Sequence, residues 1–271
     1  MKKLIINLQR VPIYTFFLGL AACVVLLTAS TAYQGENSSL DRSLVGCLFR
    51  EPFNNSAGVL LLNVLDQPSS MGVWLITLFP VFAVMPYASG YCSELRTKGF
   101  YFSCSRMSHR SFCLSHFFAC GIYSVLVMLG ALVFTFLLCT IGCNHIFADV
   151  SAVTLFKLCC SYCVFAFTVG SICISLCSLM LDPFVICCGV SLVIYIMINV
   201  SSVYLVQFAA ANNGEPNRLI YLLYIPDHAR GFSQFSQLYG ISRLFYYFAV
   251  VLVNSACAAV FYICTKRRVS Q

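Results

Sequence analysis

Long apolar runs without charge alternate with short polar segments along this chain. A helix needs about 20 residues to cross a hydrocarbon core of about 30 Å, so each run of that length is a candidate membrane span. Six runs qualify, and they cover residues 11–33, 72–91, 112–141, 158–181, 184–208 and 244–265. The runs are apolar on every side and lack the alternation of membrane-barrel strands. We therefore predict an all-α polytopic membrane protein with six transmembrane helices.

The composition agrees with this class. Hydrophobic residues make up 60% of the 271 positions and charged residues 9%, and the mean hydropathy is +0.87. Such a chain has too few polar side chains to cover a soluble globule. Of the 17 cysteines, all but Cys47 and Cys143 lie in or beside spans or on the predicted inner side, where thiols behave as small apolar groups. The topology also allows a disulfide between Cys47 and Cys143, and this alternative stays open.

The basic residues predict the orientation, because Lys and Arg are retained on the cytosolic side of short loops. With both termini inside, ten of the 16 Lys and Arg residues lie on the inner side and six on the outer side. The formal charge of +7 then reflects topology and gives no reason to expect a nucleic acid partner. We predict a multi-pass protein of the plasma membrane with both termini in the cytosol.

The loops between the predicted spans differ in length and composition. Residues 34–70 form a long outer loop that is too polar to span and too short for an ordinary separate domain. Residues 209–243 contain only a short apolar stretch, so we predict an outer segment that re-enters the membrane or lies on it. Asp182 and Pro183 alone join the fourth and fifth spans, which predicts a tight hairpin with Asp182 as the N-cap of the fifth helix.

The first and second spans carry local signals of their own. The first resembles a targeting signal, because Leu20 to Cys23 forms a fair lipobox after a basic start, yet the apolar run continues past Cys23. We expect an uncleaved first helix, with cleavage after Ala32 as the alternative. In the second span, Pro80 and Pro86 interrupt the backbone hydrogen-bond ladder, so kinks are expected there.

The sequence contains no recognised signature of catalysis. No Gly precedes a Lys, so the phosphate-binding loop of P-loop ATPases is missing. None of the four His is followed by Glu, which excludes the H-E-x-x-H zinc motif, and residues 189–193 lack the last Gly of a G-x-S-x-G elbow. We expect no enzyme activity, no cofactor and no metal site in this chain itself.

Polar residues inside the predicted spans are sparse. Asn199 in the fifth span and Asn254 in the sixth are candidates for lining a translocation path, although such residues more often hydrogen-bond neighbouring helices. No span carries the stacked acidic or basic side chains of an ion pathway. An ion-driven pump is therefore disfavoured.

The inner segment 93–111 concentrates charge in an otherwise apolar chain. Glu94 stands four residues before Lys98, which is the favourable order on a helix, and Arg106 and Arg110 would share one face of a second short helix. Aromatic residues are interleaved with these charges, which is typical of a segment lying along the membrane surface. The alternative is a plain basic loop that obeys the positive-inside rule.

The second span and its inner exit resemble a known family. The residues concerned are Trp74, Leu78, Phe79, Pro80, Met85, Pro86, Tyr87, Ala88, Tyr91, Glu94, Gly99 and Phe100, followed by a Ser/Arg cluster. This pattern is similar to the second helix and coupling segment of ABC-2 type ABC transporter permeases, and the layout of six spans with inner termini fits the same family. The chain departs from the family pattern at Ser108-His109-Arg110, and at His116, where a Lys is common.

The resemblance implies that the whole chain is one transmembrane permease domain. It would pair with a second permease subunit, identical or homologous, and with cytosolic ABC ATPase subunits that carry ATP and Mg. The ATPases would dock on the coupling segment, whose candidate residues are Glu94, Lys98, Gly99, Arg106 and Arg110. Substrate would pass between the permease halves, chiefly outward, and would be an antimicrobial peptide, an antibiotic or a lipid-like molecule.

Two hypotheses from other functional classes stay open. One is a non-transporting immunity or scaffold protein that binds a partner through its outer loops. The other is an intramembrane enzyme without a recognisable motif. A neighbouring reading frame with a Walker A motif would favour the permease over both.

The predicted orientation has a direct test. In a chain otherwise without cysteine, single cysteines at Ser43, Cys143 and Asn213 should react with an impermeant thiol reagent added from outside. Single cysteines at Ser103 and Ser270 should be protected, because the basic residues near them hold those segments in the cytosol. Labelling at position 103 from outside would reverse the topology and remove the basis for a cytosolic coupling segment.

Overall fold

The computed structural model describes residues 12–28, 31–32, 42–43, 56–58, 61, 71–97, 108–141, 151–211, 229 and 243–269. In these residues the chain is helical apart from one short antiparallel pair, in which β1 (Thr31–Ala32) lies beside β2 (Arg42–Ser43). The main helices are α2 (Ile13–Thr28), α5 (Met71–Phe79), the π-helix η1 (Pro80–Val84), α6 (Met85–Arg96), α8 (His109–Ile141), α9 (Ala152–Met180), α10 (Pro183–Ala211) and α14 (Arg243–Val269).

The helices are those of a polytopic α-helical membrane protein, as predicted. Five segments of the described chain are long and apolar enough to cross a membrane: Val73–Arg96, His109–Ile141, Ala152–Met180, Pro183–Ser201 and Tyr246–Arg267. They correspond to the second to sixth predicted spans. The helix Ile13–Leu27 is apolar but shorter. A span at residues 11–33 therefore stays a prediction, as does the orientation in the membrane.

The capping residues explain where helix ends differ from the hydropathy pattern. α9 begins at Ala152 rather than at residue 158, because the Ser151 hydroxyl accepts the Thr154 N–H at 3.2 Å and caps the helix. At the start of α10, which follows α9 in a tight hairpin, Oδ1 of Asp182 accepts the Val185 N–H at 3.2 Å. This bond confirms that Asp182 is the N-cap of α10.

The second predicted span is built from α5, η1 and α6 in succession, and we call it the broken span. Pro80 begins η1, and the Met85 N–H donates to the Pro80 carbonyl, which is the wider spacing of a π-helix. Pro86 has no N–H to donate to the Phe82 carbonyl one turn earlier. The predicted interruption of the ladder is therefore observed as a π-helical turn.

α2 packs on this π-helical turn through a glycine. A methyl group added at Gly19 would lie 2.5 Å from the carbonyl oxygen of Phe82. Real Cβ atoms do not approach a backbone oxygen that closely, so glycine is needed for the two backbones to meet here. Small residues serve the same purpose at many helix contacts in membranes.

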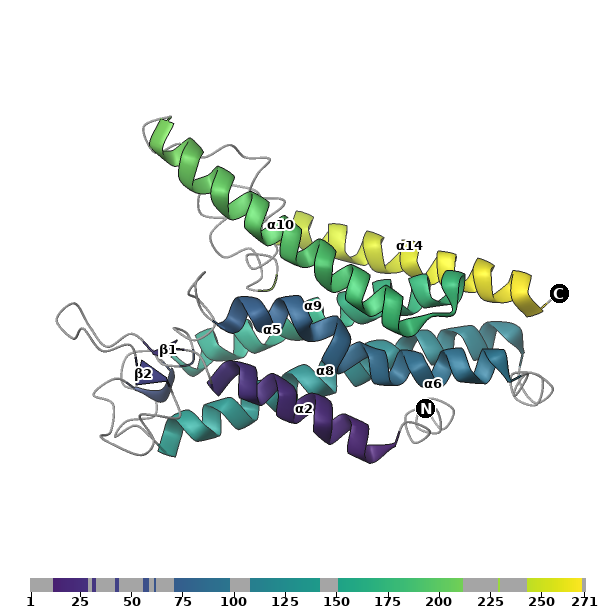
Figure 1. Cartoon of the computed structure of the whole chain (residues 1–271), viewed down its shortest axis with the longest axis horizontal. Coiled ribbons are helices and arrows are strands. Elements are labelled where there is room, and N and C mark those ends of the chain that lie inside the picture. The colour runs from purple at the N-terminus through teal and green to yellow at the C-terminus, as the bar shows by residue number, and fades with distance from the viewer. Residues whose placement is uncertain are drawn as a thin grey trace.

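α8 and α9 pack together at the centre of the fold. A methyl at Gly121 would lie 2.3 Å from the Phe167 ring, and one at Gly170 would lie 2.7 Å from Oγ of Ser124. Gly121 lets the Phe167 ring rest on the backbone of α8, and Gly170 lets α9 approach Ser124 of α8 closely. α2 then contacts α8, and α14 contacts α9, while α10 diverges from the bundle towards its C-terminal end (Figure 1).

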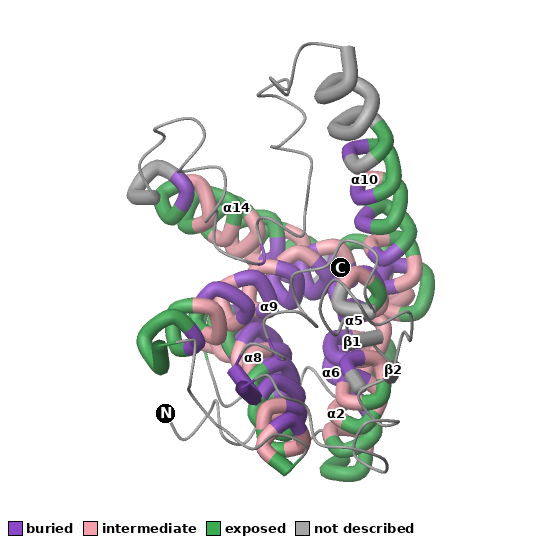
Figure 2. The backbone as a smooth tube through the Cα atoms, turned by 90° about the vertical axis from the view of Figure 1, so that its left-hand side faces the viewer, coloured by how far each residue is buried: buried purple, intermediate pink, exposed green. Residues whose placement is uncertain are grey.

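Burial is unequal among the spans. More than half of the apolar window of α9 is buried, at 56%, whereas only 11% of that of α14 is. Figure 2 shows the same contrast, with more buried residues along α8 and α9 than along α10 and α14, which are mostly exposed or intermediate. The outer helices therefore leave large apolar faces for lipid or for another protein.

Other predictions concern residues outside the described part of the chain. These are most of the outer loop 34–70, nearly all of the outer segment 209–243, and both Cys47 and Cys143. Every cysteine that the structure describes is a free thiol. Within the same part of the chain, no group of His, Cys, Asp and Glu side chains is placed to hold a metal ion.

Gly19→Ala should lower the free energy of unfolding by about 1–3 kcal/mol, because the added methyl does not fit against the Phe82 oxygen unless α2 moves. Gly90→Ala is the matched control. No atom lies within 4 Å of its added methyl, so this change should be neutral or stabilise α6 by up to about 1 kcal/mol. Denaturant unfolding in detergent micelles, followed by circular dichroism, measures both. Equal behaviour of the two variants would contradict the close packing of α2.

Candidate functional site

The last turns of the broken span carry polar side chains that face other helices. Tyr87, Tyr91 and Glu94 recur at helical spacing on α6, so they share one face of that helix. Both tyrosines are 2% exposed. The face lies against the beginning of α8 and the end of α14, where it meets His116 and Thr265. We call these five residues the polar cluster.

His116 is the centre of the polar cluster. Its side chain is 3% exposed, and its Nδ1 lies 3.1 Å from the Tyr87 hydroxyl. Its Nε2 lies 3.7 Å from Oε2 of Glu94, whose side chain is 16% exposed. The imidazole also lies against two rings, with centroid distances of 5.4 Å to Tyr91 and 4.4 Å to Phe112. Both ring nitrogens thus face polar groups of α6 within apolar surroundings.

Tyr91 joins the same face of α6 to α14. Its hydroxyl lies 3.0 Å from Oγ1 of Thr265, and Thr265 lies 2.7 Å from the Phe261 carbonyl of its own helix. Because Thr265 has a single hydroxyl proton and directs it to that carbonyl, Tyr91 is the donor between the two helices. The bond is buried, so it fixes the side-by-side position of α6 and α14 at this level.

Arg96 makes a third connection at the end of the broken span. Its guanidinium donates to the backbone carbonyl of Leu181, which is the last residue before the N-cap of α10. Leu181 has a left-handed backbone with φ of 55° and ends α9. A cation at a helix C-terminus is favourable because the last carbonyls lack partners within the helix. The end of α6 is therefore joined to the α9–α10 hairpin as well as to α8 and α14.

The chemistry available to the polar cluster is proton exchange and hydrogen bonding. A histidine beside a carboxylate can hold a proton on either group, and ionisable side chains at membrane depth commonly mark functional positions. Among the described residues, no third His, Cys, Asp or Glu completes a metal site around this pair. The arrangement is suited to positioning helices.

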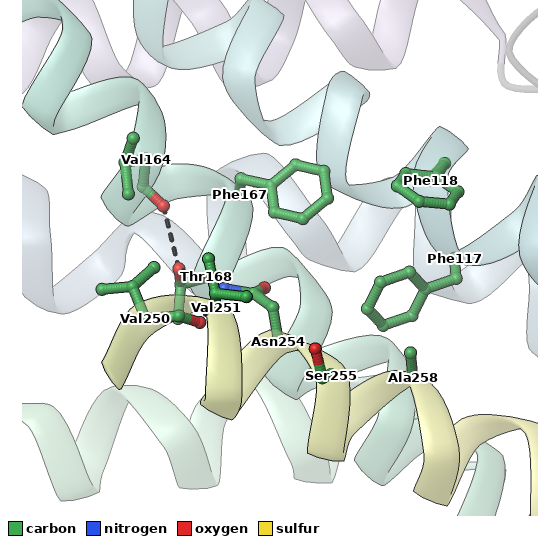
Figure 3. A pocket seen from close by; sticks show the side chains of 10 residues that line it. All are labelled: Phe117, Phe118, Val164, Phe167, Thr168, Val250, Val251, Asn254, Ser255 and Ala258. Atoms are coloured by element: carbon green, nitrogen blue, oxygen red, sulfur yellow. Dashed lines mark hydrogen bonds between the residues drawn. The ribbon is translucent and has the colours of Figure 1, made fainter. Parts of the chain in front are cut away.

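A second feature is a cavity between α8, α9 and α14 with a volume of about 340 Å³. Its walls are mainly apolar, and three phenylalanines, Phe117, Phe118 and Phe167, line one side (Figure 3). Asn254 supplies an amide on the α14 side, where Figure 3 shows it beside Thr168 and below the Phe167 ring. The cavity is open along one side to the surface of the bundle.

Asn254 behaves mainly as a contact between helices. Its Nδ2 donates to Oγ1 of Thr168 at 3.0 Å and to the Val250 carbonyl at 2.8 Å. Its Oδ1 is buried without a hydrogen-bond donor in the part of the chain that the structure describes. Asn199, the other predicted path residue, lies exposed on α10 and donates to the Tyr195 carbonyl of its own helix. The two asparagines are not brought together.

A further cavity of about 300 Å³ continues along the seam between α8 and α14. Its lining residues are Arg110, Cys113, Leu114, Phe117, Ala258, Phe261 and Tyr262. Phe117 and Ala258 line both cavities. We call the two together the α8–α14 groove, which runs from Arg110 at one end to Val250 at the other.

The predicted coupling residues are only partly described. Glu94 lies on α6 and faces His116, and Arg110 lies exposed in the first turn of α8. Lys98, Gly99 and Arg106 lie outside the described residues. Their role in binding an ATPase therefore stays a prediction.

The contacts of His116 were not predicted from the sequence. His116 lies inside the predicted third span, and an ionisable side chain in an apolar run is by itself a reason to look for a partner. Glu94 lies three residues after the second predicted span and His116 lies near the beginning of the third, so both members of the pair lie close to span ends on the predicted inner side. Thr265 gave no comparable signal, because an isolated threonine in a span is common.

Comparison with known proteins does not place the chain in a family. No family model, no curated protein and no solved structure matches it. The observations support a polytopic α-helical membrane protein. The likeness to ABC-2 permeases rests on the sequence pattern alone.

His116→Ala should lower the free energy of unfolding by about 1–3 kcal/mol, because a buried hydroxyl and a largely buried carboxylate both lose this contact. Glu94→Gln keeps the size of the side chain and its ability to hydrogen-bond, so it should cost less than His116→Ala. Thermal unfolding in detergent measures both variants. A smaller effect for His116→Ala than for Glu94→Gln would show that the cluster is not centred on the imidazole.

Proposed function

We propose that this chain is the permease subunit of an ABC transporter of the ABC-2 type, working as an exporter with separate ATPase subunits. Its ATPases would bind the segment between α6 and α8 on the cytosolic side of the plasma membrane. A second permease subunit, identical or homologous, would complete the translocation path. The observation that carries the proposal is the set of contacts made by the broken span.

The broken span contacts every other long helix of the described chain. Its helices and η1 pack on α2, α8, α9 and α10. Tyr91 adds the hydrogen bond to α14, and Arg96 adds the bond to the end of α9. A force applied just beyond Arg96 would therefore reach all of the spans. The coupling segment is predicted at this position.

The π-helical turn supports a role in movement. π-helical segments are rare, commonly occur at functional sites, and interrupt the regular ladder of the helix. In the broken span the turn separates α5 from α6, and α6 is the part of this span that contributes residues to the polar cluster. α6 can thus change its angle relative to α5 while its contacts with α8 and α14 are retained. Such hinges within elements are a common means of switching between two states.

The exposed face of α10 supports a second subunit. Leu192, Ile196, Asn199 and Val203 recur at helical spacing, and all are exposed. An amide at membrane depth is costly in lipid unless it faces protein or a water-filled path. We expect the second permease subunit to cover this face, with Asn199 next to the substrate path.

Co-purification from native membranes tests the proposal. Tagged wild-type chain should recover a protein with a Walker A motif, and the complex should hydrolyse ATP. Gly99→Pro and Arg106→Glu should each reduce recovery of that protein at least about tenfold, because one stiffens the docking segment and the other reverses a charge in the interface. Lys157→Gln is the charge control, since Lys157 is exposed on α9 away from this segment.

Two outcomes would contradict the proposal. One is wild-type recovery of the ATPase in both variants, provided that both insert with the wild-type labelling pattern. The other is ATP hydrolysis by a preparation of the chain shown to be free of other subunits. Recovery of an exported peptide without any ATPase would instead favour an immunity or scaffold protein.

A further inference from the structure

The α8–α14 groove has the length of one leaflet of a membrane. From Tyr262 to Val250 it follows twelve residues of α14, which is about 18 Å along the helix axis. One leaflet contributes about 15 Å of hydrocarbon, half of the bilayer core. An acyl chain that enters beside Arg110 would therefore reach the far end of the groove at the depth of the bilayer centre.

The walls of the groove suit such a chain. Phe117 lies in the middle, Phe118 and Phe167 lie on the far part, and Phe261 and Tyr262 lie on the near part. Figure 3 shows the aromatic rings of the far part facing α14 across the cavity. Methylene groups packed on these rings leave no polar atom of their own to satisfy. The polar atoms of the far wall include the Asn254 amide and the Thr168 hydroxyl, which hydrogen-bond each other.

Positive charge gathers at the near end. Arg110 lines the groove and is exposed, and Lys266 and Arg267 are exposed one turn beyond Tyr262 on α14. The acidic residues of the described chain are Glu94 and Asp182, and neither lines the groove. A ligand with an apolar chain and an anionic group at one end matches this distribution of charge.

We propose that the α8–α14 groove is a binding site for an anionic phospholipid, with the phosphate at Arg110 and one acyl chain along Phe117 towards Phe167. A second copy of this chain is a poorer occupant, because the acidic side chains described at its inner span ends are already engaged, Glu94 by His116 and Asp182 by the Val185 N–H. The lipid would occupy the groove whether or not the chain works with an ATPase.

Photocrosslinking in vesicles tests this site with the full-length chain. The vesicles are made of phosphatidylcholine and contain a trace of either phosphatidylglycerol or phosphatidylcholine with a photoreactive acyl chain. Phosphatidylglycerol should label peptides of α8 and α14 about fivefold more than phosphatidylcholine, since one basic side chain near an anionic lipid is worth about that factor. Arg110→Gln should lower the ratio, leaving only the preference due to Lys266 and Arg267, and Lys157→Gln should leave the ratio unchanged.

A second pair of variants tests the groove itself. Ala258 lines both cavities, so Ala258→Phe should lower labelling of α8 and α14 by both lipids. Ala259→Phe adds the same ring at the neighbouring exposed position and should not lower it. Circular dichroism and the insertion pattern should match wild type for both variants.

Three results would overturn the lipid site. Equal labelling by the two lipids in wild type would remove the selectivity, and an unchanged ratio in Arg110→Gln would remove the role of Arg110. The third is loss of association between differently tagged copies in Ala258→Phe with lipid labelling unchanged, which would show that a second copy of the chain occupies the groove.

Discussion

The arrangement of this protein depends on a helix that cannot keep a regular hydrogen-bond ladder in a membrane. Backbone polar groups at membrane depth must be satisfied within the protein, yet Pro80 and Pro86 remove two donors from the same span. At this place the backbone forms the π-helical turn η1, and Gly19 lets α2 approach the backbone at that turn. A regular helix in this place would change the direction of α6 and with it the partners that α6 reaches.

The contacts at the end of α6 follow from that direction. The polar cluster and the Arg96 bond join α6 to α8, α14 and the α9–α10 hairpin along the last three turns of α6. Hydrogen bonds between helices have fixed partners, whereas apolar side chains in lipid gain little from choosing one neighbour over another. The polar side chains thus set which helices meet, and the glycines of α8 and α9 set how closely they pack.

Away from these turns of α6 the outer helices are held by fewer specific contacts. α10 diverges from the bundle, and most of the apolar window of α14 is exposed (Figures 1 and 2). Their exposed surfaces differ in kind. The α10 face is a continuous stripe with one amide, which suits another protein, while the α8–α14 groove is narrow, aromatic and basic at one end, which suits a lipid. A single chain therefore offers separate surfaces to a protein partner and to the membrane.

The sequence alone determined the class of the protein, five of its long helices and the cap at Asp182, because hydropathy over about 20 residues and local capping depend on neighbours in the chain. It also located the interruption at Pro80, since proline acts on its own helix. It did not show that Glu94 faces His116, that Tyr91 reaches Thr265, or that Asn199 and Asn254 lie apart. Those pairings join residues far apart in the sequence, and every span presents apolar residues on all sides, so no periodic pattern indicates which face meets which helix. Only the packed structure, in which glycines and polar side chains choose the neighbours, decided them.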